Sequence, residues 1–381
     1  MGAPAIITGM PRLADVVDLL HSWYPPRTAD SWDAVGLVAG DPEAEVERVL
    51  FAVDPTLDVA REAAEWGADL LVVHHPLFLA PVTSVAATTP KGRTLHALTR
   101  AGCGLLTAHT NADQADGGVS ESLALALGLR DLAPIRPASG EALDKIVVFV
   151  PVADADVLRS ALTGAGAGQL GDYDTCTWTS EGVGRFRPLA GADPTIGQVG
   201  TLAEVDEVRI EVIAPRERRT AIVRALLDAH PYEEPAYEVL TLADAGLAST
   251  GTGRVGEVEQ TTLDEFAAHV ARVLPRTAHG VRVAGARDRV VRRVAVCGGA
   301  GDFLLDELAA SDVDVYLTSD LRHHRAGEFL EHDGPALVDV AHWAAEWTWL
   351  PVVEGRLRAA LGDRVETRVS TQCTDPWQFR H

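Results

Sequence analysis

The chain has 381 residues, 47% of them apolar and 23% charged, with a formal net charge of −22 at pH 7. This length exceeds one ordinary hydrophobic core, so we expect two domains, and the acidity disfavours nucleic acid and anionic membranes, which attract basic patches. No apolar run nears the roughly 20 residues that cross a bilayer, and Met1 to Met10 lack signal-peptide features. The four cysteines are scattered and form no C-x-x-C pair, which is typical of a protein of the reducing cytoplasm.

The first third of the chain predicts alternating strands and helices. Apolar residues recur at helical spacing over 12–24, where Pro25 and Pro26 end the helix, and residues 31–38 read as a turn into a strand. Short apolar runs then predict buried strands, with helices between and after them; the strands are 49–53, 69–73 and 104–108, and the helices 56–66, 92–101 and 119–127. This alternation is typical of a parallel sheet with crossover helices.

The middle of the chain, residues 136–250, has a different order of elements. We predict strands over 145–150, 172–179, 208–214 and 236–242, and helices over 155–163 and 217–229. The resulting β-α-β-β-α-β order indicates a ferredoxin-like α+β unit. Residues 243–256 are rich in Gly, Ala, Ser and Thr, so we expect them to form the linker that leaves this unit.

The last third returns to the rhythm of the first. We predict helices over 262–274, 302–310 and 325–332, and strands over 291–297, 313–318 and 336–340. The fold class is therefore α/β: residues 1–135 and 251–381 form a discontinuous α/β domain, as one body or two β-α-β lobes, and residues 136–250 are inserted into it.

Histidines and carboxylates follow the predicted strands. His74 and His75 end the strand 69–73, while His109 and Asp113 follow the strand 104–108. Ligands of α/β sheets gather at the carboxyl ends of strands. Because neighbouring side chains of a strand point to opposite sides, His74 and His75 are better placed to serve two ions than to share one.

His342 and Glu346 complete this pattern after the last predicted strand. If a helix begins at His342, the two residues lie at i and i+4 on one face. Three imidazoles, two carboxylates and no thiolate suit Zn, Mn, Fe, Co or Ni better than Mg or Ca, and two carboxylates can bridge two ions. Alone, each piece also has an ordinary explanation: a surface pair, a helix pair or a helix N-cap. Together they predict a metal site.

These motifs resemble those of the Nif3-like dinuclear metal-centre proteins, also known as homologues of GTP cyclohydrolase 1 type 2. The middle segment, with His-Pro-Tyr-Glu-Glu-Pro at 230–235, is similar to the PII/CutA-like middle domain of the longer members. The matching motifs are Trp32-Asp33-Ala34-Val35-Gly36-Leu37, Val73-His74-His75-Pro76, His109-Thr110-Asn111-Ala112-Asp113, Thr318-Ser319-Asp320 with His324, and Asp339 with His342 and Glu346.

The resemblance implies a ligand set, a metal content and an assembly. It assigns two divalent metal ions per subunit to the set already reached from side-chain chemistry: His74, His75, Asp113, His342 and Glu346. It also implies a toroidal homohexamer with metal pairs facing an internal cavity. Ala34 stands where the family usually has Asn, and Ser319 where it usually has Gly, which puts local substrate contacts in doubt.

Several other residues could carry chemistry. His324 and His109, with His323, lie near the predicted metals and could act as general acid or base, or only hydrogen-bond or face solvent. The glycine run 298–301 could cradle a phosphate or form a tight turn, which Asp302 and the missing P-loop lysine favour. His230 and Glu233 could bind a metal in the insert, although a turn between helix and strand is the simpler interpretation.

Two functions follow as hypotheses. In the first, the protein is a metal-dependent hydrolase that attacks a nucleotide or another phosphate-bearing small molecule through a metal-bridging hydroxide. In the second, it is a non-catalytic metal-binding or regulatory assembly, and its PII-like insert senses a ligand or a partner. The attribution to GTP ring opening rests on the resemblance and not on site chemistry.

Overall fold

The computed structural model describes residues 9–138, 142–171, 173–243 and 249–381, so most of the Met1 to Met10 segment lies outside the described residues. The chain folds into two compact units. Ser139–Leu247 belong to one of them, the inner unit. Pro4–Ala138 and Ala248–His381 together form the other, the outer unit. No described helix is long and apolar enough to cross a membrane.

The first sheet of the outer unit has five strands in the order β1-β4-β3-β2-β17. Neighbouring strands are parallel except β1, which runs antiparallel to β4. All four residues of β3 are buried, as expected for a parallel strand covered on both faces. The strands are β1 Gly36–Ala39, β2 Arg48–Ala52, β3 Leu70–Val73, β4 Gly104–Thr107 and β17 Glu366–Val369.

The second sheet of the outer unit has six strands in the order β13-β16-β15-β14-β12-β5. Its centre, β14-β15-β16, is parallel, and its other pairs are antiparallel. The strands are β5 Arg130–Ala133, β12 Arg254–Thr262, β13 Val281–Ala284, β14 Val290–Ala300, β15 Val315–Ser319 and β16 Ala336–Val340; β6 Arg136–Pro137 and β11 Gly251–Thr252 form a separate two-stranded pair.

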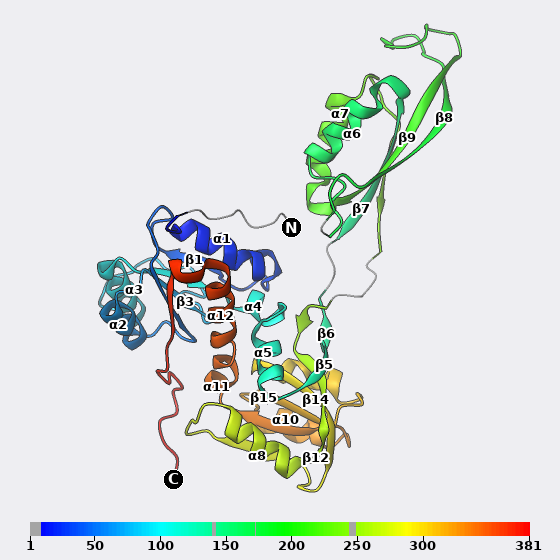
Figure 1. Cartoon of the computed structure of the whole chain (residues 1–381). Coiled ribbons are helices and arrows are strands. Elements are labelled where there is room, and N and C mark those ends of the chain that lie inside the picture. The colour runs from blue at the N-terminus through cyan, green and yellow to red at the C-terminus, as the bar shows by residue number, and fades with distance from the viewer. Residues whose placement is uncertain (1–8, 139–141, 172, 244–248) are drawn as a thin grey trace. The chain divides into compact units, whose positions relative to one another are not determined.

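Helices join the two sheets of the outer unit into one core (Figure 1). Helices α5 and α11 pack on β14, whereas α12 packs on β2 and β17. Buried residues of both sheets and of these helices, among them Phe51, Leu123, Val296 and Trp349, belong to one continuous cluster. The helices are α1 Leu13–Trp23, α2 Leu57–Trp66, α3 Pro90–Ala101, α4 Thr110–Gln114, α5 Val119–Ala126, α8 Leu263–Val273, α9 Leu305–Leu308, α10 His323–Leu330, α11 His342–Trp347 and α12 Leu350–Leu361.

A buried arginine ties the two parts of the outer unit together. Arg254 on β12 is 1% exposed and donates to the backbone carbonyls of Gly251, Gly253 and Ala115. It also pairs with Glu121 on α5 at 3.2 Å. A charge removed from water requires such partners. Gly251 and Thr252 form β11, and Arg254 begins β12. The prediction of a linker over 243–256 is therefore wrong from Gly251 onward, and residues 244–248 lie outside the described residues.

The inner unit is a four-stranded antiparallel sheet in the order β10-β7-β9-β8, with two helices. Alternate residues of the central strands, such as Val148 and Ile210, pack against α6 and α7. The elements follow the β-α-β-β-α-β order of a ferredoxin-like unit: β7 Leu143–Pro151, α6 Ala155–Gly164, β8 Thr177–Phe186, β9 Ala203–Pro215, α7 Arg219–Ala229 and β10 Tyr237–Thr241.

The predicted strand over 172–179 is misplaced. The observed β8 begins at Thr177 and continues to Phe186, paired with β9 along its whole length. Its second half contains two glycines and is mostly exposed, so it lacks the regular apolar alternation that marks a strand. Asp172 itself lies outside the described residues.

Candidate metal centre

Side chains that follow the parallel strands of both sheets meet at one place in the outer unit. His74 and His75 come directly after β3, and His109 follows β4 by two residues. From the second sheet, Asp320 comes directly after β15, while His342 begins α11 just beyond β16. Parallel strands present their carboxyl ends at one edge, which brings these distant residues together.

His74 is the most deeply buried of the imidazoles. Its Nδ1 lies 2.9 Å from the carbonyl oxygen of Ala108, to which it can only donate. The lone pair of Nε2 then faces two carboxylates, with Glu346 Oε1 at 3.4 Å and Asp113 Oδ1 at 3.6 Å. The fold thus fixes the tautomer that a metal ligand needs.

His75 and His342 are each oriented by a carboxylate. Nδ1 of His75 lies 2.7 Å from Asp54 Oδ1, and Nδ1 of His342 lies 2.6 Å from Asp320 Oδ2. Their Nε2 atoms point to Glu346, at 3.1 Å from Oε2 and 2.8 Å from Oε1 respectively. A carboxylate behind a histidine is the usual support of a metal-binding imidazole.

His109 is held in the same way. Its Nδ1 lies 2.8 Å from Asp33 Oδ1, and Asp33 also accepts hydrogen bonds from the backbone and hydroxyl of Thr110. The ring of His109 stands edge-on to those of His74 and His75, with centroids 5.0 and 5.5 Å away. The structure therefore places this histidine in the cluster itself.

Buried atoms without partners indicate that the cluster fits a cation. Potential ligand atoms of His74, His75 and His109, and of His75, His342 and Glu346, lie within 4.8 Å of one another. Nε2 of His74 and Oδ1 of Asp113 are buried without a hydrogen-bond partner. Each such atom costs about 1–3 kcal/mol unless it is satisfied. A divalent metal that accepts imidazole and carboxylate would satisfy both.

The carboxylate of Glu346 controls the protonation of the histidines around it. Burial lowers the pKa of His75, but Glu346 and Asp54 outweigh burial and raise it to about 11. Burial also lowers the pKa of His342, but Glu346 and Asp320 outweigh burial and raise this pKa to about 10. Burial raises the pKa of Glu346, but the neighbouring imidazoles outweigh burial and hold this pKa well below its usual value. Without metal, protons on two imidazoles balance this carboxylate.

Gly299 provides the space in which the ligands meet. It lies at the end of β14 with φ of +70°, and a Cβ there would be 2.7 Å from Glu346 Oε1 and 3.3 Å from His342 Nε2. Residues 298–300 of the glycine run are thus the end of a strand beside the cluster. This strand end replaces the tight turn expected from the sequence, and it leaves the phosphate cradle without support.

The other predicted residues lie apart from the cluster or have ordinary roles. His323 and His324 are exposed on α10 and belong to neither ligand group found among the described residues. His230 uses both ring nitrogens, since Nε2 donates to the carbonyl of Phe149 and Nδ1 accepts from the backbone of Tyr232. Glu233 accepts from the backbone of Asp193. The turn interpretation of 230–235 is the one that these contacts favour.

Sequence reasoning gave no role to the three carboxylates that orient histidines, Asp33, Asp54 and Asp320, although Asp33 and Asp320 lie in the motifs that carry the family resemblance. Asp54 and Asp320 follow β2 and β15 closely, so their position after a predicted strand was the available signal. Asp320 also has φ of +58°, a conformation uncommon outside glycine that clusters at functional sites. Neither the pairing with a particular histidine nor this backbone conformation can be read from spacing.

The fold and the cluster define an α/β protein whose outer unit has a candidate metal centre between its five-stranded and six-stranded sheets. The chain belongs to the Duf34/NIF3 (NGG1p interacting factor 3) family, whose model matches residues 11–376. The resemblance to the Nif3-like proteins is therefore confirmed, as is a mixed α/β fold with several sheets.

Relatives match almost the entire chain. A Mycobacterium tuberculosis protein named GTP cyclohydrolase 1 type 2 homolog is 49% identical over 372 residues, covering 97% of each chain. A Bacillus subtilis protein of the same name is 35% identical over 368 residues, covering 96% of this chain and 97% of its own. The solved structure of a Bacillus cereus protein related to NIF3 has 36% identity and a TM-score of 0.77; that of Staphylococcus aureus SA1388 has 29% and 0.82. Each alignment with a structure covers 98% of this chain and 100% of the other.

Replacing Gly299 by alanine should damage the centre without removing a ligand. The positive φ should cost about 1–2 kcal/mol in the free energy of unfolding, and the new Cβ should displace Glu346 and lower the amount of bound metal. Urea unfolding and elemental analysis measure the two effects. Gly327→Ala on α10 is the matched control, because nothing lies within 4 Å of its added Cβ. Unchanged metal content in Gly299→Ala would contradict the close approach.

Metal binding should release protons. At about pH 7.5, pKa values of about 11 and 10 leave His75 and His342 doubly protonated without metal. A metal takes the Nε2 lone pair, so we expect about two protons to leave per chain and the affinity to rise with pH. Both values exceed the usual ~6.5, so these histidines stabilise the metal-free fold below about pH 6.5 and lose this effect toward pH 10–11. Calorimetry in buffers of different ionisation enthalpy measures the release; identical heats in all buffers would contradict it.

Proposed function

We propose that the cluster binds two divalent metal ions per chain and that Glu346 is shared between them. The distances support one group of His74, Asp113 and Glu346, and a second of His75, His342 and Glu346. The observation that carries this proposal is the convergence of imidazoles with fixed Nδ1 partners on one buried carboxylate. Zn, Fe, Mn, Co and Ni all suit this ligand set.

We propose further that the centre is that of a metal-dependent hydrolase. When bound, the ions would supply Lewis-acid activation of water and offset negative charge in the transition state. His109 is suited to proton transfer, because Asp33 holds Nδ1 and leaves Nε2 free on the side of the cluster. The exposed Trp32, edge-on to His109 at 5.9 Å, offers an aromatic surface beside the site.

The substrate class rests on the relatives. Their name, GTP cyclohydrolase 1 type 2 homolog, supports a nucleotide or another phosphate-bearing small molecule. We also propose His324 as a second general acid or base. His324 lies outside both ligand groups of the described chain, so this role requires His324 to come closer to the metal centre. The proposed setting is a cytoplasmic, toroidal homohexamer that includes a PII/CutA-like inner unit, for which the ferredoxin-like order gives support.

A non-catalytic role is the second candidate. His74, Asp113 and Glu346 are buried or only partly accessible in the chain, which suits firm metal retention as well as catalysis. In that case the protein would hold metal in a regulatory assembly, and its inner unit would sense a ligand or a partner. The two candidates differ in turnover and not in metal content.

Metal content tests the ligand set. Elemental analysis of the purified wild type should give roughly two ions per chain, and His75→Ala or Asp113→Ala should clearly reduce this number. His324→Ala serves as a matched control, because His324 lies outside both ligand groups. Equal metal content in all four proteins would refute the ligand assignment.

Turnover tests the enzyme. Nucleotides and phosphoesters should be screened with Zn, Mn, Fe or Co, and any activity should fall at least about 100-fold in Glu346→Ala and His74→Ala. His109→Ala should retain metal better than these variants but lose rate, by about 10²–10⁴-fold for a general acid or base. If no substrate is turned over faster by wild type than by Glu346→Ala, the non-catalytic candidate is preferred.

A further inference from the structure

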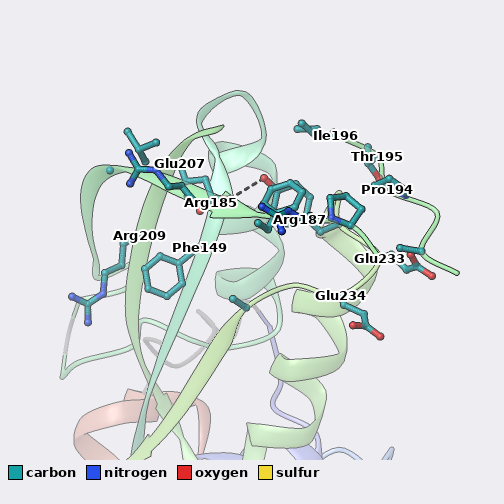
Figure 2. A pocket seen from close by; sticks show the side chains of 18 of the residues that line it. Phe149, Arg185, Arg187, Pro194, Thr195, Ile196, Glu207, Arg209, Glu233 and Glu234 are labelled. Carbon is teal, nitrogen blue, oxygen red and sulfur yellow. Dashed lines mark hydrogen bonds between the residues drawn. The ribbon is translucent and has the colours of Figure 1, made fainter. Parts of the chain in front are cut away.

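The inner unit has a cavity of about 870 Å³ on the face of its sheet that the helices leave uncovered (Figure 2). Val148, Val208 and Ile210 point to α6 and α7. Because side chains alternate along a strand, Phe149, Glu207 and Arg209 point to the other side and line the cavity. The loop 187–196 and residues 232–236 form its walls. This volume is in the range of small-molecule sites.

A buried carboxylate without a cation faces this cavity. Glu207 is only 9% exposed, and its Oε1 accepts the hydroxyl of Tyr232 at 2.8 Å. Burial and Glu207 raise the pKa of Tyr232, so this hydroxyl keeps its proton and remains a donor. In the described part of the chain, no Lys, Arg or His forms an ion pair with Glu207, and the nearby Arg185 and Arg209 pair with Glu204 and Glu211 instead. A carboxylate removed from water without a counter-charge is costly. Among the described residues no hydrogen bond is made to Oε2, which lies against Gly184 of β8.

Aromatic rings and a bare stretch of backbone surround this carboxylate. Phe186 and Tyr232 stand edge to face, with centroids 5.4 Å apart, and Phe149 lines the same cavity. A Cβ on Gly184 would lie 2.2 Å from Glu207 Oε2, so glycine lets Glu207 lie across β8. At Gly182, which lines the floor of the cavity, nothing lies within 4 Å of an added Cβ, so the space above this residue is open. Aromatic faces beside a carboxylate are the usual environment of an organic ammonium group.

The charges around the cavity also favour a cation. Two of its three arginines have acidic partners, since Arg185 pairs with Glu204 at 2.8 Å and Arg209 with Glu211 at 2.9 Å. In Figure 2 the guanidinium of Arg209 extends away from Glu207. The third, Arg187, is exposed. Against these stand four lining carboxylates, the buried Glu207 and three exposed ones: Glu181, Glu233 and Glu234.

We propose that this cavity is a binding site for a small aliphatic polyamine-like cation. One ammonium group binds the carboxylate of Glu207 beside the aromatic rings, the carbon chain crosses the floor at Gly182, and further ammonium groups meet the carboxylates at the rim. This site is independent of the metal centre, because every residue that lines it belongs to the inner unit.

The site is tested by measuring spermidine binding to the full-length protein in the presence of a metal chelator. Calorimetry should show saturable binding to wild type that weakens at least about tenfold in Glu207→Gln, because the variant loses the charge but keeps an acceptor for Tyr232. Gly182→Val should abolish binding, since a β-branched residue suits a strand and fills the floor. Circular dichroism should show that both variants remain folded.

Two controls separate a built site from general attraction to an acidic protein. Glu238→Gln removes an exposed carboxylate of the same unit outside the cavity, and Gly164→Ala adds a methyl group in open space at the end of α6. Both should bind spermidine like wild type. Equal weakening in Glu207→Gln and Glu238→Gln would overturn the proposal, as would unchanged binding in Gly182→Val. Binding of inorganic phosphate instead of spermidine would also overturn it.

Discussion

A single buried carboxylate, that of Glu346, organises the outer unit. Glu346 is 2% exposed, yet three imidazoles lie within 3.4 Å of its oxygens. A carboxylate at this depth is tolerated only because cations, either protons on the imidazoles or metal ions, replace the lost water. The arrangement requires α11 to lie on β14, and it requires the residue under the carboxylate, Gly299, to have no side chain.

This requirement explains why a discontinuous domain must close before it has a site. His74, His75 and Asp113 precede the inner unit in sequence, whereas His342 and Glu346 follow it. The chain leaves and re-enters the outer unit through β6 and β11, which pair with each other, so the ends of the insertion are adjacent. Arg254, next to this pair, binds backbone carbonyls from both parts of the chain. An insertion with neighbouring ends can therefore be long without disturbing the centre.

The sequence predicts the centre better than its surroundings. Buried parallel strands are continuous apolar runs, so β3 and the histidines at its end stand out, and helical periodicity places His342 and Glu346 on one face. Strands that lack this contrast, such as β8, β12 and β17, owe their pairing to partners far away in sequence. The same holds for Asp54 and Asp320, because only the folded sheets decide which histidine each carboxylate meets.

The two units treat a buried carboxylate in opposite ways. In the outer unit, each histidine around Glu346 has its Nδ1 bound, so the remaining nitrogen can only face the carboxylate or a metal. In the inner unit, Glu207 receives one neutral hydroxyl, lies against Gly184 and lines the cavity without an ion pair among the described residues. In the outer unit the ligands are already in place, so a bound metal ion can be retained. In the inner unit the counter-charge of Glu207 must come from a cation in solution, and that cation can be released again.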